Sequence, residues 1–135
     1  TIWDVAKWYN PNTPSDPWKT YRAGSTSNDM PSIDNTMGLW LHITSVGDGI
    51  ITVTGTEPTD TDISLYAGWN LVSYPSMTDN DAESSLTGTG ADIVGKFQET
   101  TPYVSDTTSL SSVTMTNGEA YWVHVPATTT WTVTY

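Results

Sequence analysis

The chain has 135 residues, enough for one compact domain or for two small units that share a core. Its net charge of −11, with only 4 Lys and Arg, argues against nucleic acid or anionic membranes as partners, because phosphate groups attract cations. The absence of cysteine excludes disulfides, thiol nucleophiles and thiolate metal sites. Charged residues make up only 14% of the chain, so Thr, Ser, Asn and Gly must supply most of the surface. This composition is common in secreted and cell-surface proteins, so we expect an extracellular location.

The first third of the chain predicts two polar loops and a β-hairpin. Residues 10–17 contain three prolines, so they form neither a helix nor an inner strand. Residues 25–32 are a second polar connection. Residues 39–43 alternate with period two, which is typical of a half-buried strand, and a turn at 47–49 leads to a second strand at 51–54.

The alternation in the strand at 39–43 assigns its side chains to two faces. Leu39, Leu41 and Ile43 lie on one face, and Trp40 and His42 lie on the other. We expect the aliphatic face to be the more deeply buried of the two.

The middle of the chain predicts a linker and two strands. Residues 57–62 have the composition of a linker. A short strand follows at 63–65, and a longer one at 71–74 is entered through Gly68 and ended by Pro75.

One short helix is expected between Thr78 and Ile93. Asp79 or Asn80 can cap its first turn. Gly88 and Gly90 then limit it to about two turns, because glycine is costly inside a helix.

The last third predicts a polar connection at 106–116, a strand at 121–125 and a final strand at 130–135. The last two strands are joined by the short link 126–129, which predicts a hairpin like the first one.

The chain also contains a weak copy of itself. Three pairs of segments match: 38–43 with 120–125, 51–54 with 131–134, and 5–8 with 94–97. Self-similarity of this kind predicts units that complete one another's cores. We therefore predict a first β pseudo-repeat over residues 1–62 and a second over 63–135. The fold class is all-β with at most one short helix, and the two pseudo-repeats pack as a β-sandwich or barrel-like pair around a Trp-rich core.

The string Gly68-Trp69-Asn70-Leu71-Val72-Ser73-Tyr74-Pro75 carries a resemblance to known proteins. Together with the segments 18–21, 37–43, 51–55 and 118–125, it resembles a family of repeats in extracellular proteins of archaea and bacteria. The resemblance implies a non-catalytic β module of cell-surface or secreted proteins, and it implies no catalytic residues.

The first pseudo-repeat lacks a counterpart of the Gly-Trp-Asn-Leu-Val strand. We expect another segment or a neighbouring subunit to supply that strand by adding to a sheet edge. The expected partners are thus other domains of the parent chain or neighbouring subunits, with glycan as an alternative.

Five aromatic residues gather in the first 21 positions: Trp3, Trp8, Tyr9, Trp18 and Tyr21. Such rings can stack on sugars, so a carbohydrate- or polymer-binding module of a secreted hydrolase is an alternative to a structural or adhesion module. Packing between the two copies is the competing explanation for the same rings. A third alternative is a filament or capsid subunit.

Two acidic clusters are the candidate metal ligands, Asp60 with Asp62 and Asp79 with Asp81. Clustered oxygens suit Ca²⁺, but neither cluster has the twelve-residue EF-hand spacing, so solvated turn or cap acids are the competing explanation. No other cofactor is expected. His42 and His124 occupy matching positions, which suggests a paired metal site or simply a copied surface residue.

Catalytic patterns are weak. The chain has no Gly-x-Ser-x-Gly elbow around Ser73 or any other serine, and its carboxylates are scattered over loops. We therefore expect a protein that is not an enzyme.

Overall fold

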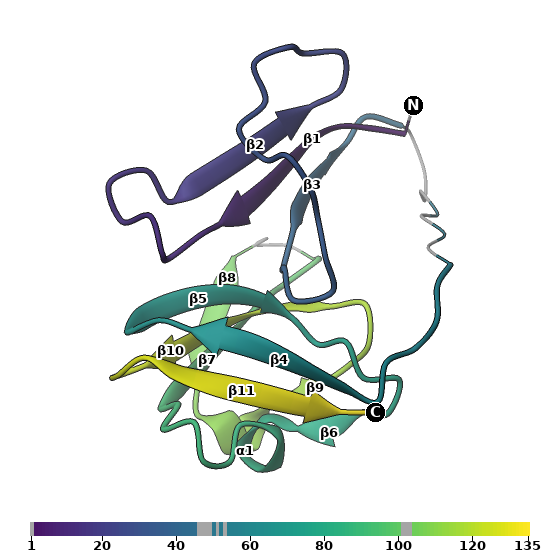
Figure 1. The fold of residues 1–135 in the computed structure, drawn as a ribbon. Coiled ribbons are helices and arrows are strands. Elements are labelled where there is room, and N and C mark those ends of the chain that lie inside the picture. Colours follow the sequence, from purple (N-terminus) through teal and green to yellow (C-terminus); the bar gives the residue numbers. More distant parts are fainter. Residues whose placement is uncertain (1, 46–49, 51, 53, 101–103) are drawn as a thin grey trace.

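The structure, a computed structural model, describes residues 2–45, 50, 52, 54–100 and 104–135 (Figure 1). The regular elements of its described part are antiparallel strands, one short α-helix and one 3₁₀ turn. The predicted all-β fold is confirmed, and the stacked antiparallel sheets form a β-sandwich.

Three strands form a sheet that we call the amino-terminal sheet. They are β1 (Trp3–Tyr9), β2 (Trp18–Arg22) and β3 (Trp40–Ile43), in the order β2-β1-β3. Ala6, Met30 and Met37 form a small buried cluster against this sheet. The loop between β2 and β3 therefore supplies two of the three buried side chains.

Four strands form the main sheet, in the order β5-β10-β7-β8, and two more form the cover sheet, in the order β11-β4. The strands of the main sheet are β5 (Gly68–Ser73), β7 (Ile93–Phe97), β8 (Ser105–Thr108) and β10 (Ala120–Val125). The cover sheet contains β4 (Asp60–Leu65) and β11 (Thr129–Thr134). Smaller elements close one end: β6 (Asn80–Asp81), α1 (Ala82–Ser85), a 3₁₀ turn (Leu110–Ser112) and β9 (Thr114–Met115).

The main hydrophobic core lies between the main sheet and the cover sheet. Alternation along β10 places Tyr121, Val123 and Val125 on the core face, where each is fully buried. Trp131 of the cover sheet faces them, and its indole N–H donates to the carbonyl of Ser85 at 2.7 Å. The core thus belongs to the carboxy-terminal half and is not shared equally between the two copies.

The amino-terminal sheet repeats three strands of the main sheet, since β2-β1-β3 has the same order as β8-β7-β10. In β1 and β3, Ala6 pairs with Leu41, and in β7 and β10, Val94 pairs with Val123. Ala6, and not Val5, is therefore the counterpart of Val94. The sequence match of 5–8 with 94–97 is wrong by one residue, and β1 carries a register shift between Trp3 and Val5.

An aromatic layer joins the amino-terminal sheet to the main sheet. Trp40 packs edge-on against Phe97 with ring centroids 4.6 Å apart, and Tyr9 packs edge-on against Trp122 at 5.2 Å. Because Tyr9 and Phe97 end equivalent strands, these two contacts are one contact repeated about a pseudo-twofold axis. Trp18 adds a third ring next to Trp122, at 6.0 Å.

Backbone contacts fix the same junction. The N–H of Gly38 donates to Leu71 at 3.3 Å, and the N–H of Ser73 donates to Thr36 at 3.2 Å. A Cβ atom on Gly38 would lie 2.7 Å from the carbonyl oxygen of Val72, so only glycine allows this approach.

Several predicted elements need correction. The expected hairpin of the last two strands is wrong, because β10 and β11 lie in different sheets. Both strands have an apolar face that must reach the same core, so the chain crosses from one sheet to the other at the link 126–129. The expected linker 57–62 is wrong in its second half, because β4 already begins at Asp60. The connection 106–116 contains most of β8, the 3₁₀ turn and β9.

The predicted helix exists but is shorter than expected. It covers Ala82–Ser85, and Asp81 caps it by accepting a hydrogen bond from the N–H of Ser84 at 2.7 Å. Neither Asp79 nor Asn80 is the cap, because Asn80 pairs with Met115 in the small β6-β9 ladder. The expected strand at 51–54 and turn at 47–49 lie outside the described residues.

Candidate functional site

The five aromatic residues predicted as a platform are divided between two faces of the amino-terminal sheet. Tyr9 and Trp18 lie on the face that meets Trp122. Trp3, Trp8 and Tyr21 lie on the opposite face, and the rings of Trp3 and Tyr21 are tilted by 48°. Trp18 is 40% exposed and Tyr21 is 38% exposed. The structure therefore places no row of three parallel rings here.

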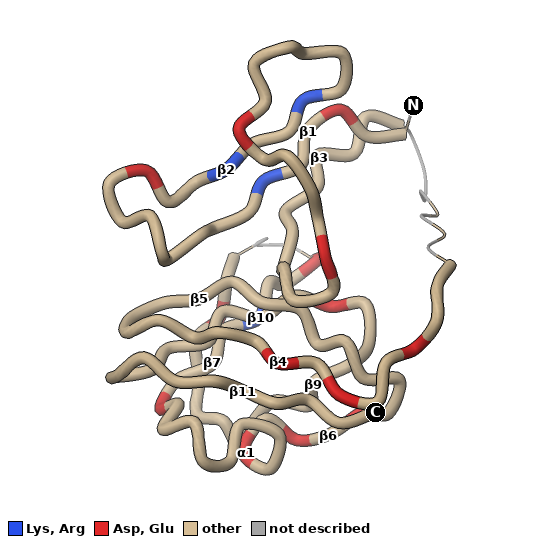
Figure 2. Tube along the Cα trace, viewed as in Figure 1, with Lys and Arg blue, Asp and Glu red and all other residues tan. Residues whose placement is uncertain are grey.

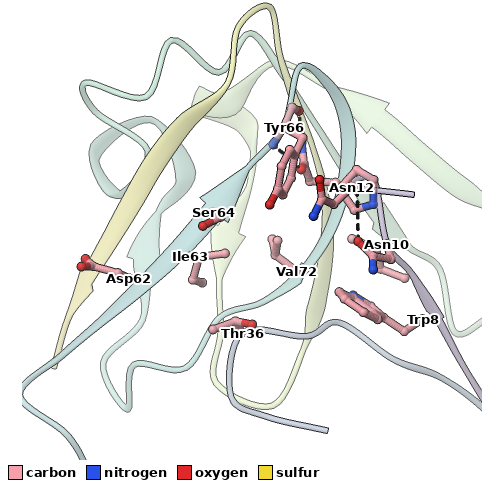
Figure 3. A pocket seen from close by; sticks show the side chains of 12 residues that line it. Trp8, Asn10, Asn12, Thr36, Asp62, Ile63, Ser64, Tyr66 and Val72 are labelled. Carbon is pink, nitrogen blue, oxygen red and sulfur yellow. Dashed lines mark hydrogen bonds between the residues drawn. The ribbon is translucent and has the colours of Figure 1, made fainter. Parts of the chain in front are cut away.

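A groove of about 280 Å³ lies between the end of β1 and the β4-β5 hairpin (Figure 3). Trp8 forms one wall together with Asn10 and Asn12, and Tyr66 and Ser64 lie across from them. The remaining lining residues are Pro11, Thr36, Asp62, Ile63, Asn70, Leu71 and Val72.

The chemistry of this groove suits a polyhydroxylated ligand. The half-buried ring of Trp8 offers an apolar face, and the exposed amide of Asn12 offers a donor and an acceptor. The Asn10 carboxamide oxygen accepts the N–H of Asn12 at 3.0 Å, which fixes the loop that carries both amides. Asn70 contributes shape only, because its amide is already bonded to backbone groups of Tyr66, Gly68 and Val123.

Of these groove residues, the sequence indicated Trp8 and the proline-rich loop, but not Tyr66, Asn10 or Asn12 as partners. The signal available was the pair of asparagines flanking Pro11, which marks a fixed turn. Nothing in the sequence places that turn against the β4-β5 hairpin.

A second, larger cavity of about 550 Å³ lies at the aromatic junction, next to Trp40, Phe97 and Trp122. It also exposes the ion pair between Lys96 and Glu119, whose N–O distance is 2.6 Å. Partial burial opposes ionisation of Glu119, but hydrogen bonds from Lys96 and Tyr121 outweigh it and hold the pKa of this carboxyl below its ordinary value.

The phenol of Tyr121 is part of the same network. Burial, reinforced by the hydrogen bond to Glu119 at 2.7 Å, raises the pKa of Tyr121 above its ordinary value. The phenol therefore stays protonated and serves as a structural donor under the core.

The amino-terminal sheet and the main sheet each carry one equivalent Asp–His pair. The distance from Nδ1 to the carboxylate Oδ1 is 2.7 Å both for His42 with Asp4 and for His124 with Asp92. The hydrogen bond from His124 holds the pKa of Asp92 below its ordinary value. The hydroxyl of Ser73 donates to the carbonyl of Asn35, so it points to a structural contact and not to either imidazole.

The candidate metal ligands are spread over two regions. Asp60 and Asp62 lie on β4 and accept hydrogen bonds from Thr134 and Thr132 at 3.0 and 2.6 Å. Asp81 is the helix cap described above, and its bond with Ser84 lowers the pKa of its carboxyl. Asp79 is exposed beside it. Within the described ranges, no three or more His, Asp or Glu side chains converge as a metal site.

Three of the four basic residues lie on the amino-terminal sheet, where β1 and β2 carry Lys7, Lys19 and Arg22 (Figure 2). Acidic residues are spread over all sheets in the same view. In the part of the chain that the structure describes, no helix is long and apolar enough to span a membrane.

Comparison with protein-family models gives no match for this chain. Comparisons with curated proteins and with solved structures give no significant match either.

Proposed function

We propose that this chain is a non-catalytic structural module of an extracellular surface assembly. The observation that carries the proposal is the aromatic layer between the two related sheets. Trp40 and Trp122 occupy equivalent positions and pack into the junction, so these rings stabilise the arrangement of the sheets. A ligand platform would instead present such rings side by side to solvent.

A joint measurement of binding and unfolding tests this proposal. We expect a glycan array to give no specific signal, and we expect intrinsic Trp fluorescence to stay unchanged when glycans are added. Denaturant unfolding should give coincident transitions by fluorescence and by far-UV circular dichroism, because the aromatic layer couples the two sheets. Specific glycan binding, turnover of a substrate, or two separate transitions would contradict the proposal.

A second candidate function is binding of a polyhydroxylated ligand, and the groove at Trp8 favours it. A saccharide array should then give a saturable signal that the variant Asn12→Ala weakens by about tenfold, the effect of losing one or two hydrogen bonds. Tyr21→Ala is the matched control, because Tyr21 is an exposed ring outside the groove. Equal loss in both variants would exclude the groove as the binding site.

A further inference from the structure

The two related sheets differ at one edge. In the main sheet, β10 lies between β7 and β5. In the amino-terminal sheet, β3 pairs with β1 on one side, and no strand among the described residues pairs with its other side. The edge that β5 covers in one copy is therefore not covered by any described strand in the other.

Backbone directions show which groups this open edge presents. The N–H of Thr44 donates to Ile2 on the β1 side at 2.9 Å. Because backbone groups alternate in direction along a strand, the N–H and C=O groups of Leu41 and Ile43 point away from β1. An extended segment beside β3 would meet these two residues in a regular ladder.

The same groups are paired in the main sheet. Val123 and Val125 are the counterparts of Leu41 and Ile43, and they lie opposite Asn70 and Gly68 of β5. The amide of Asn70 also donates to the carbonyl of Val123 at 3.3 Å, which adds a side-chain bond to the ladder.

The apolar face next to this edge is also only partly covered. Leu41 is 37% exposed and Ile43 is 42% exposed, whereas Val123 and Val125 are both 0% exposed. The main-sheet valines are covered by the cover sheet, to which β4 contributes Ile63 and Leu65. The β4-β5 hairpin thus supplies both features that the amino-terminal sheet lacks: the neighbouring strand and part of the apolar cover.

We infer that β3 is a strand acceptor, and that its occupant is an extended hairpin of β4-β5 character donated by a neighbouring polypeptide. The main sheet fixes the register: Leu41 lies opposite the position of Asn70, Trp40 opposite that of Leu71 and His42 opposite that of Trp69. Main-chain hydrogen bonds to β3 provide the affinity. The apolar face of Leu41 and Ile43 selects a donor hairpin with apolar side chains at alternating positions. This inference names the partner of the structural module proposed above, so it rests on that proposal.

The test uses the full chain and a synthetic peptide with the sequence of its own residues 60–75. We expect saturable binding by fluorescence anisotropy of a labelled peptide. Hydrogen exchange should slow by about tenfold or more at the amides of Leu41 and Ile43, as expected when open edge groups gain ladder bonds. Protection at another sheet edge, or no binding at millimolar peptide, would overturn the inference.

Two N-methylated peptides provide the matched control on the donor side. In β5, the carbonyl of Leu71 bonds outward to Gly38, so the N–H of Asn70 points toward the acceptor strand, where the register places Asn70 opposite Leu41. Methylation of the Asn70 nitrogen should abolish binding, and methylation of the Leu71 nitrogen should leave most of it. Equal affinity of the two peptides would show that no ladder forms.

Two variants of the chain provide the control on the acceptor side. Leu41→Pro removes an outward N–H, and Leu41→Thr keeps it while shortening the side chain, so only the first should lose binding. The peptide comparison on the wild-type chain decides the question if Leu41→Pro does not fold. A failure of peptide binding with no glycan signal would overturn the acceptor alone, whereas glycan binding or catalysis would contradict the structural function itself.

Discussion

The amino-terminal sheet and its counterpart in the main sheet share strand order, register and an Asp–His pair, yet their burial differs widely. Val123 and Val125 are fully buried, while the equivalent Leu41 and Ile43 are about two-fifths exposed. The local pattern of apolar and polar residues is the same in both. The difference in burial comes from the cover sheet, because its strands β4 and β11 face only the main sheet.

This comparison separates two kinds of stabilisation. The carboxy-terminal half has a core of its own, packed between two sheets. Among the described residues, the amino-terminal sheet has a cluster of three buried side chains, and it depends on the aromatic junction and on Met37 and Gly38 beside β5. We therefore expect a substitution in the core of the carboxy-terminal half to lower the free energy of unfolding more than a substitution in the amino-terminal sheet.

The largest effect is expected from Trp131→Ala in the core. The variant leaves a large cavity and an unpaired carbonyl at Ser85, so the free energy of unfolding should fall by about 3–5 kcal/mol. Leu41→Ala in the amino-terminal sheet should cost only about 1 kcal/mol, because the side chain is already partly in water. Denaturant unfolding measures both, and similar losses would contradict the difference in burial.

A smaller effect is expected from the paired indoles of the junction. Trp122 contacts Tyr9, Trp18 and Trp69, so Trp122→Ala should cost about 2–3 kcal/mol. Among the described residues, its counterpart Trp40 has one ring contact, with Phe97, and Trp40→Ala should cost about 1 kcal/mol.

A double-mutant cycle sharpens this prediction. The coupling between Tyr9 and Trp122 should be about 0.5–1.5 kcal/mol, as for other edge-on aromatic pairs. A coupling of zero would mean that the layer fills space without specific ring contacts.

The next effect is expected at Gly38, whose backbone lies close to that of Val72. Gly38→Ala should cost about 1–3 kcal/mol, because the added methyl group collides with the backbone of Val72 and must push the sheets apart. Gly55→Ala is the matched control, since a Cβ there meets no neighbour, and it should change stability by less than about 0.5 kcal/mol. Equal decreases in melting temperature for Gly38→Ala and Gly55→Ala would show that the close contact between Gly38 and Val72 is not the source of the strain.

The smallest expected effect is on the acid dependence of the melting temperature. The pKa of Asp92 is lowered in the folded state, so its contribution to stability is present above the ordinary carboxyl pKa of about 3.9 and is lost as the pH falls through the lower folded value. Asp92→Asn should therefore lower the melting temperature at neutral pH and flatten its decline between about pH 4 and 2.

Glu57→Gln provides the control for this measurement, because Glu57 is exposed in the linker. Its pH profile should follow that of the wild-type chain. Parallel profiles for Asp92→Asn and the wild-type chain would show that the pair with His124 does not stabilise the fold.

Much of the secondary structure followed from residue patterns, and the candidate site followed only in part. Period-two alternation located β3 and β10, because a strand half-covered on one face must alternate, whereas Gly68 and Pro75 marked the limits of β5. The aromatic cluster was found as a group, but its members were not assigned to faces. Trp8 and Tyr9 are neighbours in sequence and yet serve a groove and a junction, because successive side chains point to opposite faces.

The sequence by itself determined the class of the fold, its internal duplication and the absence of thiol chemistry, since these depend on composition and short-range periodicity. Only the tertiary structure decided that β11 pairs with β4 and not with β10, and that Ala6 is the counterpart of Val94. It also decided that no described strand pairs with the second edge of β3. Those outcomes depend on which distant strands reach the same core. A local pattern shows that a face needs cover, but it does not show which segment provides it.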